Sequence, residues 1–307
     1  MVSVLFALLT ALCNGVASVL QRIAASSAPP ERALHLSLFA YLIRRKVWLA
    51  GIGLVVCAAV CQAIALATGP VALVQPIFII ELPFTLLVAS RVTRYRLSRR
   101  TWLAVALVTV SLGVGLFAAA PSGGSSYAST KVWVTTLIVT GGFEAVVIAV
   151  GVRARGNVRA AALGLAAACG YALTATLLKS AVATLDQGVG AFFSTWQLYA
   201  TAAAGVGALF LLQNALQAGR LVYVQPPLTL GDALISISYG VTVFGESVRT
   251  GGWLAIQIIA VLAIALGCVD LSRSLSEVHG PESAALPTSG PTSGPTSGPA
   301  SGPVSGG

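Results

Sequence analysis

Two stretches of this sequence decide the fold: residues 65–76 read ALATGPVALVQP, and residues 215–226 read ALQAGRLVYVQP. They are identical at six of twelve positions, at an offset of 150 residues. At an offset of 151, WLA at residues 102–104 matches WLA at residues 253–255. The chain therefore contains an internal repeat.

The composition around these stretches is that of a membrane protein. Of 307 residues, 56% are hydrophobic and 9% are charged, against about 25% charged in an ordinary soluble domain. So few charges cannot keep a surface of this size hydrated, which excludes a soluble enzyme, a nucleic-acid-binding domain and a disordered chain. We predict an all-α, polytopic membrane protein.

Nine segments are apolar over the roughly 20 residues that a membrane-spanning helix needs. The first four form repeat one (about 2–120), the last four form repeat two (about 160–271), and the fifth lies between them and turns the second copy over. The sequence thus predicts an inverted-topology repeat. The nine predicted spans are residues 2–21, 47–67, 71–90, 102–120, 132–152, 160–184, 196–213, 221–244 and 253–271.

Basic residues are unevenly distributed between alternate loops. The loops after spans one, three, five and seven, with the C-terminal segment, hold 15 Lys and Arg, and the other loops hold 2. Because cytoplasmic loops are enriched in Lys and Arg, we predict that the N-terminus lies outside, the C-terminus lies inside, and the first span is retained. Residues 33–43 are apolar but short, so we predict an interfacial helix there, with a tenth span as the alternative.

Beyond residue 271 the hydrophobicity falls, and Pro-x-Ser-Gly units fill residues 287–306. Such a composition cannot bury a core. We therefore divide the chain into a transmembrane transporter domain, residues 1–271, and a disordered Pro/Ser/Gly-rich cytoplasmic tail, residues 272–307. Arg outnumbers Lys 15 to 3, which is typical of a GC-rich bacterium, so we predict a multi-pass protein of a bacterial plasma membrane.

Prolines lie at matching places in the two repeats. The third span contains Pro76 and Pro83, and the eighth contains Pro226 and Pro227. Each proline frees a carbonyl four residues back, and interrupted spans at corresponding places in inverted repeats indicate transporter binding sites. We predict helix breaks at these prolines, with freed carbonyl oxygens available to a cation or polar substrate. A kink satisfied by a neighbouring helix is the alternative.

Ionisable side chains inside a membrane are costly and mark functional sites. Four lie well inside predicted spans, away from their ends: Glu81, Glu144, Lys179 and Asp232. Glu81 and Asp232 follow the paired prolines by five and six residues, so a two-fold axis in the membrane plane would bring them to a common cavity. Repulsion between two such carboxylates favours uptake of a proton. Alternatively, Lys179 pairs with one acid, or it reaches outward to the interface.

Neutral polar side chains extend this predicted site. In the eighth span, together with Asp232, they recur at spacings of 4, 3, 4 and 3 from Gln225 to Tyr239, which places them on one helix face. Gln75 matches Gln225 in the first repeat, and Asn14 lies in a shorter polar seam of the first span. The predicted substrate- or coupling-ion-binding residues are Glu81, Asp232, Gln75, Gln225, Asn14, Thr229, Ser236, Glu144 and Lys179.

Three motifs resemble the drug/metabolite transporter superfamily. The stretch PVALVQP at residues 70–76, followed by Arg96-Leu97, resembles the third span of that superfamily, and WLAG at residues 48–51 is similar to the beginning of the second span in its NIPA-like magnesium transporter branch. Phe244-Gly245-Glu246 resembles the Gly-Glu signature of EamA-like members. The similarity covers about residues 2–271 and implies nine spans and secondary transport.

The sequence also departs from the magnesium branch. Ala58 and Ala59 stand where that branch typically has a Gly-Glu pair, Gln62 replaces an Asn, and Tyr95 replaces a Glu. Glu81 stands where the branch usually has a small polar residue. Magnesium prefers hard oxygen ligands and one expected carboxylate is missing, so the metal question stays open alongside an organic or proton-coupled substrate.

We therefore predict a secondary transporter that moves a small polar or cationic solute by alternating access, either proton-coupled or facilitative. The alternatives are a NIPA-like magnesium or other divalent-cation transporter and a membrane scaffold that moves nothing. We find no zinc-protease, phosphate-loop or nucleophile motif in the sequence, so no enzyme and no cofactor is predicted. The expected partners are the solute and the lipid bilayer, with no nucleic acid, and a homodimer remains open.

Overall fold

The computed structural model of the protein describes residues 1–26, 45–93, 97–219 and 221–279. Over these ranges the chain is almost entirely helical and contains no strand. The predicted interfacial helix at residues 33–43 and the tail from residue 280 lie outside the described residues, as does Tyr95.

Nine spans are long and apolar enough to cross a bilayer within the described part of the chain. This confirms the number predicted from the sequence, and the bounds agree to within a few residues. The long helices are α1 Val2–Ser26, α3 Lys46–Thr68, α6 Arg99–Ala119, α7 Thr130–Arg153, α8 Gly156–Ala183, α10 Trp196–Ala218, α11 Leu221–Phe244 and α12 Trp253–His279. The remaining span is built from α4 Val71–Ile77, the 3-10 turn η2 Phe78–Ile80 and α5 Glu81–Thr93. The short η3 Thr184–Gln187 and α9 Val189–Ser194 follow α8.

The last helix extends beyond the domain boundary that we predicted at residue 271. It continues to His279, because its end is held against the beginning of α6. Arg100 donates to Asp270 at 2.7 Å, and the hydroxyls of Thr101 and Ser274 are 2.9 Å apart. Residues 272–279 are therefore helix, in place of the first part of the predicted tail.

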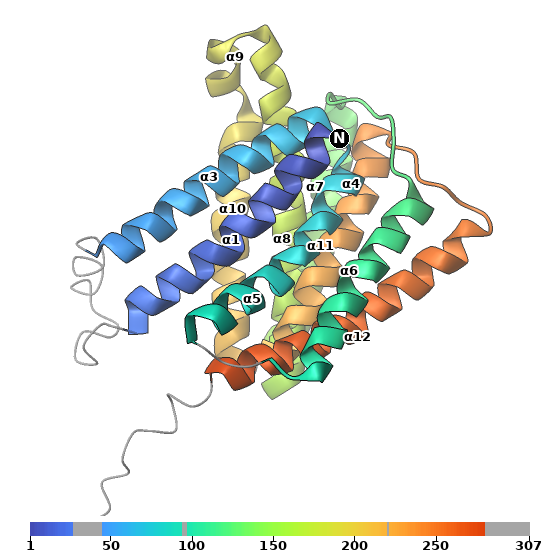
Figure 1. Cartoon of the computed structure of the whole chain (residues 1–307). Coiled ribbons are helices and arrows are strands. Elements are labelled where there is room, and N and C mark those ends of the chain that lie inside the picture. The colour runs from blue at the N-terminus through green and yellow to red at the C-terminus, as the bar shows by residue number, and fades with distance from the viewer. Residues whose placement is uncertain (27–44, 94–96, 220, 280–307) are drawn as a thin grey trace, which may run out of the picture.

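Helix α8 is the centre of the bundle, and it packs against α3, α4, α7, α10 and α11. Its buried residues are mostly small, including Ala166, Ala167 and Ala168, and small residues let membrane helices approach closely. Around it, α1 packs against α3 and α5, α4 against α11, and α6 against α12. In Figure 1, α1 begins at one end of the bundle and α12 ends at the opposite one, as an odd number of spans requires.

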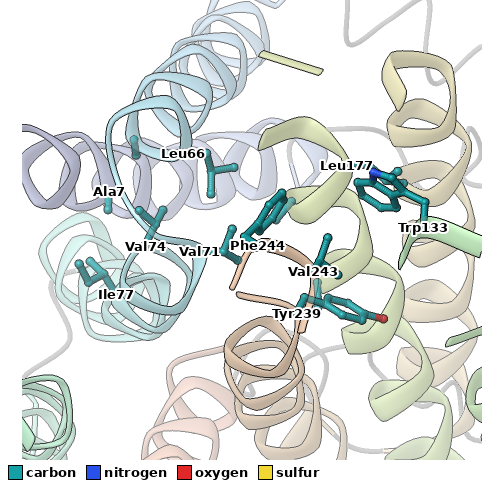
Figure 2. Packing of buried hydrophobic residues seen from close by; sticks show 13 residues of the cluster. Ala7, Leu66, Val71, Val74, Ile77, Trp133, Leu177, Tyr239, Val243 and Phe244 are labelled. Carbon is teal, nitrogen blue, oxygen red and sulfur yellow. The ribbon is translucent and has the colours of Figure 1, made fainter. Parts of the chain in front are cut away.

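The apolar residues divide between a core and an outer surface, as expected for a bilayer-embedded bundle. Val110, Ile138, Phe210 and Leu262 are each at least 60% exposed. Figure 2 shows a core cluster to which α1, α3, α4, α7, α8 and α11 all contribute. Because six helices share this cluster, the two halves of the chain fold as one unit.

Candidate functional site

The third span is broken just before its acidic residue. Helix α4 contains Pro76 and ends at Ile77, the 3-10 turn η2 follows, and Glu81 is the first residue of α5. A proline removes a helical hydrogen bond, and 3-10 turns within helices often mark functional hinges. The break therefore holds the Glu81 side chain at the beginning of a helix in the middle of the span.

The eighth span differs from our prediction, because α11 runs unbroken from Leu221 to Phe244 through Pro226 and Pro227. The carbonyls freed by these prolines belong to Val222 and Tyr223, which lie in the first turn. So little helix precedes them that losing those bonds does not separate two segments. Pro83 lies in the first turn of α5, where a proline is tolerated.

A cavity of about 440 Å³ lies in the middle of the bundle. It is bordered by central parts of α1, α8 and α10, by α3, by α4–η2–α5 and by the first half of α11. Six of the nine predicted site residues line it: Asn14, Gln75, Glu81, Gln225, Thr229 and Asp232. The other lining residues are Gln62, Phe78, Ile79, Leu82, Tyr171, Thr174, Gly205, Leu212 and Leu228.

The cavity wall is built largely from pairs of residues 150 positions apart. Gln75 and Gln225 form one such pair and are chemically identical. Leu82, the residue after Glu81, pairs in the same way with Asp232. The remaining pairs are Gln62 with Leu212, Phe78 with Leu228, and Ile79 with Thr229. Each half of the chain thus contributes a glutamine amide and a carboxylate at nearly the same place, and the first half adds the amides of Asn14 and Gln62.

The two carboxylates are the charged groups among the described residues that line the cavity. The Asn14 amide donates to Glu81 at 3.4 Å, and the Ser236 hydroxyl donates to Asp232 at 3.5 Å. Neither acid takes part in an ion pair within the described ranges. The cavity thus presents two acidic groups whose only protein hydrogen bonds there come from neutral donors.

Three predicted site residues do not line the cavity. Ser236 is fully buried one turn beyond Asp232 and reaches it only by the hydrogen bond above. Glu144 lies on α7, on the face that carries Thr140, whose hydroxyl is 2.7 Å from that of Tyr239. Pro76, which was predicted as a helix break and is not one of these three, lines a second, apolar cavity of about 380 Å³ bordered by α6, α11 and α12.

Lys179 is the third predicted site residue outside the cavity. It forms a buried ion pair with Glu246, a residue that we had not counted among the intramembrane charges. Their Nζ and Oε1 atoms are 2.7 Å apart, and the two side chains are 6% and 0% exposed. Lys179 also donates to the Gly69 carbonyl at 3.1 Å and lies 4.8 Å from the centre of the Phe244 ring. Lys179 therefore neither pairs with a cavity acid nor reaches outward.

Glu246 in turn binds the N-terminus of α4. Its carboxylate accepts hydrogen bonds from the backbone N–H groups of Val71, at 2.7 Å, and Ala72, at 2.9 Å. The first N–H groups of a helix lack intrahelical partners and favour a negative charge. One carboxylate thus joins the loop after α11 to the beginning of α4 and to α8.

Two glycines make room for this carboxylate. A Cβ on Gly124, whose φ is +89°, would lie 2.6 Å from Glu246 Cγ, and one on Gly240 would collide with Glu246 Oε2. Any larger residue at Gly240 would displace the Glu246 carboxylate from the N-terminus of α4.

We therefore expect Gly240→Ala to lower the free energy of unfolding by about 1–3 kcal/mol, the usual cost of overpacking, despite the better helix propensity of alanine. Unfolding of the purified protein by SDS in mixed micelles would measure the change. Gly113→Ala is the matched control, because nothing lies within 4 Å of a Cβ there. Equal stability of the two variants would contradict this account of Gly240.

Sequence reasoning did not select several cavity residues. Gln62 entered only as a departure from a family pattern, and Phe78, Tyr171 and Thr174 looked like ordinary span residues. The 150-residue offset was the available signal for two of them, because it relates Gln62 to Leu212 and Phe78 to Leu228. Among the described residues, no cluster of three or more His, Cys, Asp or Glu is placed to hold a metal ion.

Nine apolar helices within the described ranges define the class: this is a multi-pass membrane protein. It is similar to an uncharacterized protein of Corynebacterium glutamicum, with 26% identity over 287 residues, which cover 89% of this chain and 96% of that protein. No protein-family profile matches the chain, and no solved structure matches it.

Proposed function

We propose that this protein is a secondary transporter that moves a small polar or cationic solute by alternating access. The observation that carries the proposal is the central cavity, to which each half of the chain contributes a carboxylate, Glu81 or Asp232, and an amide, Gln75 or Gln225. Transporter substrate sites lie near the bilayer midplane between repeats. Because acids inside a membrane are costly, their placement around one cavity favours solute or proton binding over a purely structural role.

The helix pairings support the inverted repeat on which alternating access would depend. The contacts of α1 with α3 and α5 correspond to those of α8 with α10 and α11. Between α6 and α12, a Cβ on Gly115 would contact Ala260, and a Cβ on Gly267 would contact Val108. Residues 108 and 260 differ by 152, as do residues 115 and 267. Such reciprocal contacts are those expected around a two-fold axis.

The proposed orientation places the beginning of α1 outside the cell and the end of α12 in the cytoplasm of a bacterium. The unequal distribution of Lys and Arg supports it. On this orientation the Lys179–Glu246 pair lies near the outer end of the bundle. The motif resemblance to the drug/metabolite transporter superfamily favours the same topology. The hydrogen bonds of Glu246 to the beginning of α4 give a structural role to the Gly-Glu motif on which part of that resemblance rests.

Alternating access makes a prediction that does not depend on knowing the solute. With the five native cysteines replaced, Thr174→Cys should react with a membrane-impermeant maleimide added from either side of sealed proteoliposomes. The reason is that the cavity opens to each side in turn. Labelling would be followed by mass shift on a gel after sidedness is established by protease.

Ala167→Cys provides the control, because Ala167 is fully buried in the same helix and should react from neither side. A Thr174→Cys variant that reacts from one side alone, or not at all, would overturn alternating access. Labelling at Ala167→Cys would indicate a loosened bundle.

A further inference from the structure

We infer that the preferred ligand of the central cavity is an organic dication with two ammonium groups, of the aliphatic diamine class. The inference rests on the proposed function, because it takes this cavity as the solute site. It adds the chemical class of the solute, which follows from the charge, the symmetry and the apolar surface of the cavity wall.

The first step is the charge. Glu81 and Asp232 carry the acidic groups of the cavity wall, and no Lys, Arg or His is among the described residues that line it. The one lysine described within the core of the bundle, Lys179, is held by Glu246. A buried carboxylate without a partner is costly. A ligand with two positive charges compensates both acids.

The second step is the symmetry. A glutamine amide and a carboxylate occur twice around the cavity, from Gln75 and Gln225 and from Glu81 and Asp232, while Asn14 and Gln62 add amides from the first half alone. A site that presents the same chemistry from two sides is complementary to a ligand with the same head group at both ends. A carboxylate accepts hydrogen bonds from an ammonium group, and such charge-assisted bonds are stronger than neutral ones.

The third step is the apolar part of the cavity wall. Phe78, Ile79, Leu82 and Leu228 contribute apolar wall, which suits a methylene chain. Phe78 and Tyr171 add aromatic rings, whose faces attract ammonium groups. A Mg²⁺ ion instead demands close octahedral oxygen coordination, and a cavity of about 440 Å³ with apolar walls is much larger than such a site.

The test is calorimetric titration of the full-length protein in detergent micelles at low ionic strength. The probes are 1,4-diaminobutane, butylamine, 1,4-butanediol and MgCl₂. The diamine should bind roughly 10- to 100-fold more tightly than butylamine, because the second ammonium adds a charged hydrogen bond. The diol, which has the same length but no charge, should show no binding over the same concentrations.

Variants then connect the ligand with the acids. Glu81→Gln or Asp232→Asn should each reduce the affinity ratio of diamine to butylamine to about one, whereas Asp186→Asn, at an exposed acid, should leave the ratio unchanged. Equal binding of diamine and butylamine by the wild type, binding of the diol, or tighter binding of Mg²⁺ would overturn the inference. Because titration needs no vectorial movement, diamine binding without two-sided labelling of Thr174→Cys would count against transport and leave the ligand class standing.

Discussion

Replacing Lys179 with methionine should lower the free energy of unfolding by about 3 kcal/mol, the order found when one partner of a buried ion pair is removed. Methionine keeps most of the side-chain volume, so packing around α8 is retained. What is lost is the 2.7 Å contact with Glu246 and the bond to the Gly69 carbonyl. The remaining carboxylate is fully buried, with only the N–H groups of α4 to compensate it.

The measurement is SDS unfolding in mixed micelles, compared with the double variant Lys179→Met with Glu246→Gln. Removing both charges should restore part of the lost stability, because no uncompensated charge stays buried. Arg100→Gln is the control on an exposed ion pair, for which we expect a loss of at most about 1 kcal/mol. A Lys179→Met protein as stable as the wild type would show that the pair contributes nothing.

The spans could be predicted closely because their signal is local. The sequence places the first and eighth spans at residues 2–21 and 221–244, and the structure gives Val2–Gln21 and Leu221–Phe244. The internal offset then pairs Gln75 with Gln225 and relates Glu81 to Asp232. Six predicted residues accordingly line one cavity.

The partner of Lys179 could not be predicted, because it depends on which loop folds over which helix. Glu246 lies beyond the apolar run of α11, 67 residues from Lys179 in sequence, so it looked like a loop residue. Glu144 is the converse case. Its position within an apolar span suggested the site, but Glu144 is not among the residues that line the cavity and lies near Tyr239 instead.

Neutralising both cavity acids should abolish transport. We expect Glu81→Gln with Asp232→Asn to reduce the rate of solute movement about 100-fold or more, because a cationic solute or a proton would lose both compensating charges at once. Proteoliposomes loaded with a pH-sensitive dye would be given amines, amino acids, nucleosides and Mg²⁺ in turn, with a second dye for Mg²⁺. The comparison uses the solute that the wild type moves fastest.

We expect the cavity acids Glu81 and Asp232 to matter for transport and the Lys179–Glu246 ion pair to matter for stability. The cavity acids each have a neutral donor at 3.4–3.5 Å, and Gln and Asn preserve their shape, so the double variant should unfold at nearly the same SDS concentration as the wild type. Neutralising an acid that is held only by one neutral donor costs little stability. By contrast, the Lys179–Glu246 pair connects α8 with the residue after α3 and with the beginning of α4. A stable double variant that still moves the solute at the wild-type rate would refute the assignment of Glu81 and Asp232. A wild-type protein that moves none of these solutes, with Thr174→Cys labelled from one side only, would refute transport itself.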